Sequence, residues 1–121
     1  MRQHHGEAFA GENLGWRLET IVLLHLIRKC NYEGWDVYYL KDRSGECDFV
    51  VCDGSKVLQC IQVSYDISNE KTRKREINGL LFAYKQTKCK DLLLLTDHEY
   101  QDVEIDDIAI HIQPVYEWAC Q

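Results

Sequence analysis

The stretch from Glu46 to Tyr65 constrains the fold more than any other part of this sequence. It contains two runs of apolar residues separated by Asp53-Gly54-Ser55, and an Asp-Gly pair between apolar runs predicts a β-hairpin. Successive side chains of a strand point to opposite faces. On the first strand this alternation predicts one face of Asp48, Val50 and Cys52, and an opposite face of Cys47, Phe49 and Val51.

Three polar side chains interrupt the apolar runs of this hairpin. Asp48 belongs to the first strand, and Gln62 and Ser64 share one face of the second strand. A buried polar group without a partner costs roughly 1–3 kcal/mol, so each side chain needs a hydrogen-bond partner, a bound ion or water. Two interpretations stay open: the three side chains form a functional site, or the strands lie near the edge of a sheet and their polar face is wet.

Length and composition indicate one domain over residues 1–121, with residues 1–11 expected to be flexible. Hydrophobic residues make up 45% of the chain, which argues against disorder. The longest apolar runs, Ile21–Leu24 and Leu92–Leu95, are far too short to cross a bilayer. The N-terminus lacks the apolar core of a signal peptide. We therefore expect a cytoplasmic protein without a membrane partner.

The charge is distributed unevenly along the chain. The formal net charge is -6, yet residues 71–90 carry seven of the 14 Lys and Arg residues and one acid, Glu76. A local basic patch can bind phosphates even on an acidic protein. The candidate nucleic-acid-binding residues are Lys71, Arg73, Lys74 and Arg75. The alternative is that this run forms an ordinary solvated helix face.

Hydrophobic periodicity predicts the remaining elements. A first helix is expected from about Asn13 to Cys30, with a stripe of Leu14, Leu18, Ile21 and Val22, and Glu19 lies at the border of that stripe. The other expected elements are a strand at 35–40, a helix from Ser68 or Asn69 to about Gln86, a buried strand at 91–96, an acidic loop to Asp107, a strand at 108–112 and a helix from Pro114 to Trp118. The order α-β-β-β-α-β-β-α predicts an α/β fold with a mixed central sheet flanked by helices.

A family resemblance follows from five short motifs in this order. They are Gly15-x-x-Leu18-Glu19-x-x-Val22, Val37-Tyr38-Tyr39, Glu46-Cys47-Asp48-Phe49-Val50, Ile61-Gln62-Val63-Ser64-Tyr65 and Thr72-x-x-Arg75-Glu76. Over roughly residues 12–113 the chain resembles the uncharacterised C-terminal domain of bacterial and archaeal AAA+-type ATPases. That domain belongs to the PD-(D/E)xK, restriction-endonuclease-like superfamily.

The resemblance implies a catalytic set made of Glu19, Asp48, Gln62 and Ser64. Glu19 would help to position a metal or water, and Asp48 would be the central ligand of Mg²⁺ or Mn²⁺. Active members carry an acid as second ligand and a lysine that polarises the attacking water, where this chain has Gln62 and Ser64. The implied metal ligands are therefore Asp48 and Gln62, and the ion would be weakly bound because a neutral amide lacks the carboxylate charge.

The degraded motif leaves open whether this domain is an enzyme. If it is active, it is a metal-dependent endonuclease, but loss of an acid–base group typically costs ~10²–10⁴ in rate, unless Lys71 or Lys74 takes over the role of the missing lysine. We expect a degenerate nuclease-fold module with weak or absent phosphodiester cleavage that binds DNA or RNA. The alternative is a non-catalytic regulatory or protein-interaction domain. The chain lacks G-x-x-x-x-G-K-[ST], so the partner AAA+-type ATPase domain would lie elsewhere in the same or another chain.

Overall fold

The computed structural model describes the backbone of residues 7–121 and the side chains of residues 14–121. The elements follow the order α1 (Glu7–Glu33), β1 (Asp36–Asp42), β2 (Gly45–Asp53), β3 (Lys56–Val63), α2 (Glu70–Thr87), β4 (Leu92–Thr96), β5 (Gln101–Ile105), β6 (Ile108–Pro114) and α3 (Val115–Ala119). The predicted α/β class, with a central mixed sheet flanked by helices, is confirmed.

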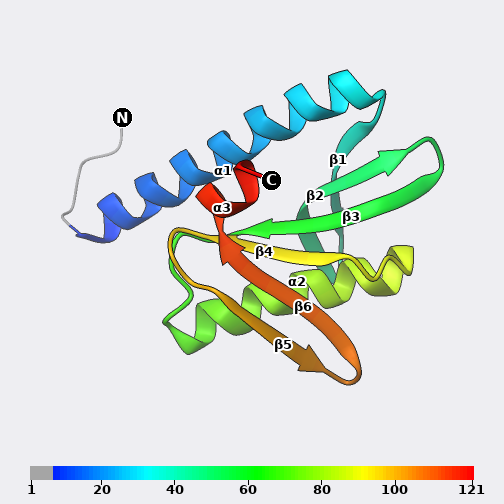
Figure 1. The fold of residues 1–121 in the computed structure, drawn as a ribbon. Helices are drawn as coiled ribbons and strands as arrows, with labels where there is room; N and C mark the ends of the chain where they lie inside the picture. Colours follow the sequence, from blue (N-terminus) through cyan, green and yellow to red (C-terminus); the bar gives the residue numbers. More distant parts are fainter. Residues whose placement is uncertain (1–6) are drawn as a thin grey trace.

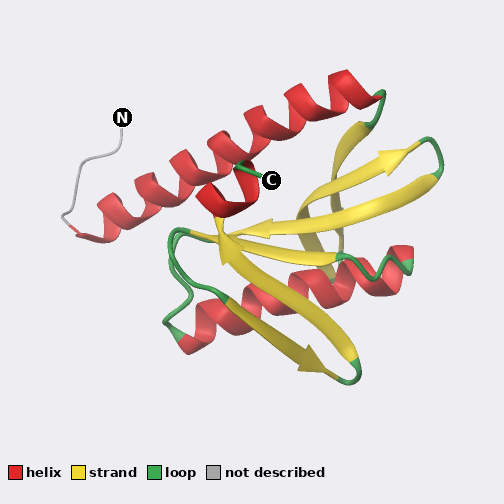
Figure 2. Ribbon diagram, viewed as in Figure 1, coloured by secondary structure: helices red, strands yellow, loops and turns green. Residues whose placement is uncertain are grey.

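The sheet has six strands in the order β1-β2-β3-β4-β6-β5 (Figure 1). Strands β3, β4 and β6 run parallel to one another, and the pairs β1–β2, β2–β3 and β5–β6 are antiparallel. Helices α1 and α3 cover one face of this sheet and α2 covers the other (Figure 2). The parallel strands therefore lie at the centre of the sheet, where helices cover both of its faces.

The core consists of two clusters, one on each face of the sheet. Strand β4 shows the division, because Leu92 and Leu94 belong to the cluster beneath α2, and Leu93 and Leu95 belong to the cluster beneath α1 and α3. All five residues of β4 are buried. The prediction of a strand buried on both faces is thus confirmed, as expected for a central parallel strand.

Two expectations about local structure were wrong. The acidic stretch before Asp107 was expected to be a loop, but Gln101–Ile105 forms β5 and pairs with β6. Val103 and Ile105 pack against the core while Asp102 and Glu104 face solvent, so these charges lie on the exposed side of an edge strand. The first helix begins at Glu7, so residues 7–11 are helical, and the rest of the stretch expected to be flexible, 1–6, lies outside the described residues.

Helix α1 buries only part of the predicted stripe. Leu18, Val22, Leu26 and Cys30 are buried at a spacing of four residues. Ile21, which was expected on the buried stripe, is 52% exposed. The reason is geometric: a spacing of four keeps side chains on one face, and a residue next to Val22 is turned away from it. Among the described helices, none combines the length and the apolar character needed to span a bilayer.

The turn and cap signals of the sequence are confirmed. Gly54 joins β2 to β3 with a positive φ of 61°, a conformation that glycine adopts without steric cost. Asn69 caps α2, because its side-chain oxygen accepts a hydrogen bond from the backbone N–H of Thr72 at 3.1 Å. These two features fix the hairpin and the start of α2, which carry most of the candidate site residues.

Helix α2 approaches the sheet closely at Gly79. A Cβ atom added there would lie 2.1 Å from Gln62 Nε2 and 2.7 Å from the backbone oxygen of Glu46. We predict that Gly79→Ala lowers the free energy of unfolding by about 1–3 kcal/mol through overpacking, measured by urea denaturation. Gly15→Ala is the matched control, because nothing lies within 4 Å of its added Cβ. That variant should be neutral or stabilising, and equal losses in both would contradict close packing at Gly79.

Candidate functional site

Strand β2 contains an irregularity next to Asp48. Tyr38 of β1 pairs with Val50, but Leu40 pairs with Cys47, so β2 has one more residue than β1 over this segment. Such a bulge shifts the alternation of side chains by one position. Cys47 therefore lies in the cluster beneath α2, together with Val50, while Phe49 lies beneath α1. The predicted common face of Cys47 and Phe49 was wrong for this reason.

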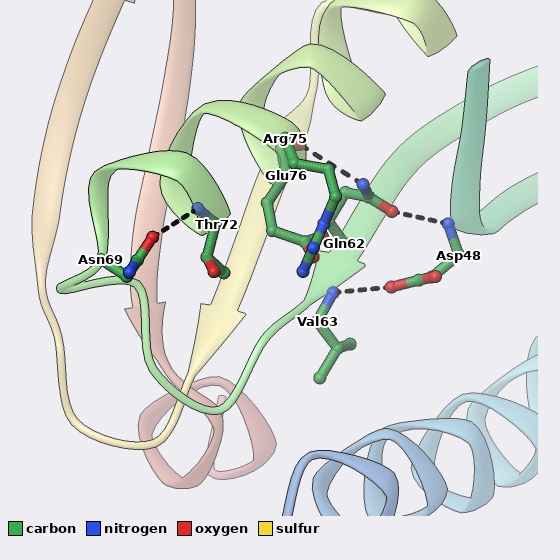
Figure 3. A network of polar contacts seen from close by, with 7 residues as sticks. All are labelled: Asp48, Gln62, Val63, Asn69, Thr72, Arg75 and Glu76. Carbon is green, nitrogen blue, oxygen red and sulfur yellow. Dashed lines mark hydrogen bonds and ion pairs between the residues drawn. The ribbon is translucent and has the colours of Figure 1, made fainter. Parts of the chain in front are cut away.

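Beyond the Phe49–Ile61 pair, two side-chain hydrogen bonds join β2 to β3, and a third joins β3 to α2 (Figure 3). The backbone N–H of Asp48 donates to Gln62 Oε1 at 2.8 Å, and the backbone N–H of Val63 donates to Asp48 Oδ2 at 3.0 Å. Gln62 Nε2 donates to the backbone oxygen of Glu76 on α2 at 3.3 Å. The buried amide of Gln62 is thus satisfied at both ends and ties the hairpin to α2.

A cavity of about 750 Å³ opens beside these hydrogen bonds, and we call it the acid cavity. Its carboxylates come from three elements: Glu19 on α1, Glu46 and Asp48 on β2, and Glu76 on α2. Its cations all come from α2, namely Lys71, Lys74 and Arg75. Helices α1 and α2 cover opposite faces of the sheet, and side chains of both line the acid cavity, beyond the Phe49–Ile61 pair at which the pairing of β2 with β3 ends.

Burial and mutual repulsion raise the pKa values of the carboxyl groups in the acid cavity. Burial and the negative charge of Asp48 raise the pKa of Glu76 to about 7, although Arg75 opposes this shift from 3.3 Å. Burial also raises the pKa of Asp48, against the hydrogen bond from Val63 N–H. The pKa of Glu19 is raised by partial burial and by the charges of Asp48 and Glu46. Ionised carboxylates in this cavity therefore destabilise one another, and a bound cation would relieve that repulsion.

Three of the four predicted catalytic residues lie together. Glu19, Asp48 and Gln62 line the acid cavity. Ser64 lies just beyond the end of β3 and lines an adjoining hollow with Glu19 and Glu76. The backbone N–H of Ser64 donates to the oxygen of Leu95 at 2.9 Å, which fixes its position beside β4.

Three of the four predicted nucleic-acid-binding residues also reach the acid cavity. Lys71, Lys74 and Arg75 line it. Arg73 does not, because its guanidinium donates to Gln101 Oε1 on β5 at 2.9 Å. The four basic side chains lie within residues 71–75, which span more than one turn of α2, so they cannot all point to one side.

Sequence reasoning missed Glu76 as a site residue. Its side chain is 13% exposed. The available signal was its position: Glu76 is the single acid among residues 71–90 and precedes the buried Leu80 by one helical turn. An acid four residues before a core leucine faces the sheet, which distinguishes it from the solvated charges around it.

The chemistry of the acid cavity fits a hard divalent cation such as Mg²⁺ or Mn²⁺, which prefers carboxylate oxygens. Asp48 and Glu76 would hold it, because both are half-buried carboxyl groups that line the cavity. Gln62 would contribute only after its oxygen released the N–H of Asp48. Within residues 14–121 no three Asp, Glu, His or Cys side chains are gathered closely enough to form a metal-binding group.

Comparison with known proteins places the chain in a family. Residues 14–117 match the family described as "Domain of unknown function (DUF4143)". The chain is also similar to the "Uncharacterized protein MJ1544" of Methanocaldococcus jannaschii, with 31% identity over 114 residues. That alignment covers 89% of this chain and 25% of the relative, so the chain spans about a quarter of the relative's length. The protein therefore belongs to the family of domains of unknown function DUF4143.

Proposed function

We propose that this domain is a degenerate member of the PD-(D/E)xK, restriction-endonuclease-like superfamily that binds the phosphate backbone of nucleic acid at the acid cavity. A divalent cation held by the carboxylates would assist that binding, and phosphodiester cleavage would be weak or absent. The domain would act in the cytoplasm beside an AAA+-type ATPase domain of the same or another chain. The fold, the resemblance of the motifs and the chemistry of the cavity all support this function.

The observation that carries the proposal is the mixture of charges in one cavity. Lys71, Lys74 and Arg75 line the same space as the carboxylates of Glu19, Asp48 and Glu76. Cationic side chains attract a phosphate, whereas bare carboxylates repel it. The combination suits a phosphate only when a divalent cation lies between it and the carboxylates. A solvated helix face would not need buried acids opposite its basic residues.

The side chains also explain why cleavage would be weak. Gln62 is committed to hydrogen bonds with Asp48 N–H and the oxygen of Glu76, so it supplies no charge to a metal. Ser64 has no basic group that could take a proton near neutral pH. A bound metal would polarise a phosphoryl oxygen or lower the pKa of a water. Lys71 and Lys74 line the cavity and are the groups on this chain that could orient such a water.

We predict that charge reversal in the acid cavity removes most of the nucleic-acid affinity. In Lys74→Glu with Arg75→Glu, binding of a fluorescent DNA in Ca²⁺ should weaken at least about tenfold, and the dependence of log Kd on log salt should become shallower by roughly 0.7–0.9 for each lost phosphate contact. Fluorescence anisotropy over a salt series measures both quantities.

Lys85→Glu with Lys90→Glu is the matched control for that variant. It changes the net charge equally, and both lysines are exposed and lie outside the acid cavity. Equal weakening in the two double variants would refute a binding site at the cavity.

Residual cleavage is tested by plasmid nicking in Mn²⁺, comparing the original protein with Asp48→Ala. Any true activity must disappear in that variant.

A second candidate, a regulatory or protein-interaction domain, is favoured by the outer side of α1. Ile21 is 52% exposed, Leu24 is 53% exposed and Ile27 is 40% exposed. Apolar side chains grouped on one helix commonly mark a protein contact. Under this hypothesis a purified AAA+-type ATPase should bind the domain, and Leu24→Glu should abolish that binding while nucleic-acid affinity is unchanged.

A further inference from the structure

Two hollows adjoin the acid cavity at Glu19. The first, which we call the Trp16 hollow, has a volume of about 610 Å³ and shares Glu19, Arg75 and Glu76 with the acid cavity. The second, the Tyr38 hollow, has a volume of about 370 Å³ and shares Glu19 and Asp48. The three spaces therefore adjoin one another around Glu19, and carboxylates line the place where they meet; we call the three together the groove.

Exposed aromatic side chains line both ends of this groove. Trp16 is 65% exposed in the Trp16 hollow, where Tyr65 also contributes to the wall. Tyr38 is 55% exposed and Tyr39 is 57% exposed in the Tyr38 hollow. Three large exposed aromatic side chains therefore border the groove, Trp16 at one end and Tyr38 and Tyr39 at the other, whereas Tyr65 is half-buried against the core.

Hydrogen bonding distinguishes the side chain of Tyr39 from those of Trp16 and Tyr38. The hydroxyl group of Tyr39 donates to Glu46 Oε1 at 2.5 Å, which ties that side chain to β2. Among the described residues, the side chains of Trp16 and Tyr38 form no hydrogen bond. Trp16 and Tyr38 are therefore the rings that a ligand would meet.

We infer that the groove accepts single-stranded nucleic acid, with unpaired bases stacked on Trp16 and Tyr38 and the backbone passing the cations of α2. This inference rests on the proposed function and specifies its substrate. Stacking on aromatic rings is how proteins hold single strands of any sequence, because every base offers a π-face. A duplex keeps its bases stacked inside the helix, so it could use the cations of the groove but not its rings.

The positions of the cations agree with a nucleic-acid backbone that runs along the groove. Arg75 lines both the acid cavity and the Trp16 hollow, so a phosphate leaving the cavity toward Trp16 stays beside a guanidinium. A guanidinium also stacks on bases and binds phosphate with two parallel hydrogen bonds. The basic residues and the rings thus lie along one groove and suit one ligand that carries both phosphates and exposed bases.

The test compares oligothymidylate with a duplex of the same length, both fluorescently labelled, binding to the protein in Ca²⁺. The single strand should bind at least about tenfold more tightly than the duplex. Trp16→Ala and Tyr38→Ala should each weaken single-strand binding by roughly 5- to 150-fold, the range that corresponds to the loss of one stacked base. Trp16→Phe should retain most of the affinity, and duplex binding should be unchanged in all three variants.

Tyr116→Ala provides the control, because Tyr116 is 63% exposed on α3 and lines none of the three spaces. Equal effects of Tyr116→Ala and Trp16→Ala, or a duplex that binds as tightly as the single strand, would overturn the inference. If charge reversal at Lys74 and Arg75 weakens binding while Trp16→Ala does not, the cavity binds phosphates without the aromatic rings and the inference is overturned. If neither nucleic acid binds, the proposed function itself is wrong.

Discussion

The domain is expected to be more stable toward urea at about pH 5 than at about pH 8, in contrast to proteins whose acids are stabilised by salt bridges. Burial beside Asp48 raises the pKa of Glu76 from 4.5 to about 7. The folded state therefore holds a proton that the unfolded chain has released, and this contribution is full below the unfolded pKa and is lost as the pH rises through the folded pKa. The shift corresponds to about 3 kcal/mol, since each pKa unit is worth 1.36 kcal/mol.

Other groups modify this profile without reversing it. The raised pKa values of Asp48 and Glu19 act in the same direction as that of Glu76. The pKa of His25 is lowered, mainly by burial, so its contribution is lost as the pH falls through its range and opposes part of the effect. The net expectation is a decline in stability from weakly acidic to neutral pH, with the largest part due to Glu76.

Glu76→Gln separates the Glu76 contribution from the rest. This variant should lose most of the pH dependence between about pH 5 and pH 8, because the group that titrates has been removed. Glu104→Gln, at an exposed position of β5, should keep the slope of the original protein. A profile that rises toward neutral pH, or one that Glu76→Gln leaves unchanged, would contradict the arrangement of carboxylates in the acid cavity.

Restoring the missing acid and base is expected to have the largest effect on activity. In Gln62→Glu with Ser64→Lys, plasmid nicking in Mn²⁺ should rise by about 10²–10⁴, the usual contribution of an acid–base group. The carboxylate at position 62 would lie in the acid cavity beside Asp48. The lysine at position 64 would lie in the hollow that Glu19 and Glu76 also line. Both additions act on the metal and on its water.

The same variant should be less stable without metal. Gln62→Glu keeps an acceptor for the N–H of Asp48 but loses the donor to the oxygen of Glu76. It also adds a negative charge to a cavity in which carboxylates already repel one another, so we expect a loss of about 1–3 kcal/mol that added Mn²⁺ reverses. Ser55→Lys with Gln86→Glu places the same charges at exposed positions and is the control. If Mn²⁺ does not change the stability of Gln62→Glu with Ser64→Lys, and nicking does not increase, the acid cavity is not a metal site.

Local patterns in the sequence were sufficient for the elements and for part of the site. The Asp53-Gly54 turn, the Asn69 cap and the apolar run of β4 each follow from short-range rules, and all three are confirmed. Alternation along β2 also identified Asp48 as a polar residue that needed a partner. Such features depend on the backbone conformation of a few neighbouring residues, which the sequence encodes directly.

The tertiary structure decided which of these residues meet. The bulge at Asp48 depends on the pairing of β2 with β1, and it turned Cys47 to the opposite face. Glu76 became a cavity residue only because α2 packs against Gln62 at Gly79. Glu19 reaches the same cavity from the other side of the sheet. The sequence determined the elements and their polar residues. Contacts between distant segments placed the acids and cations in one cavity. Those contacts depend on tertiary packing, which no local sequence pattern contains.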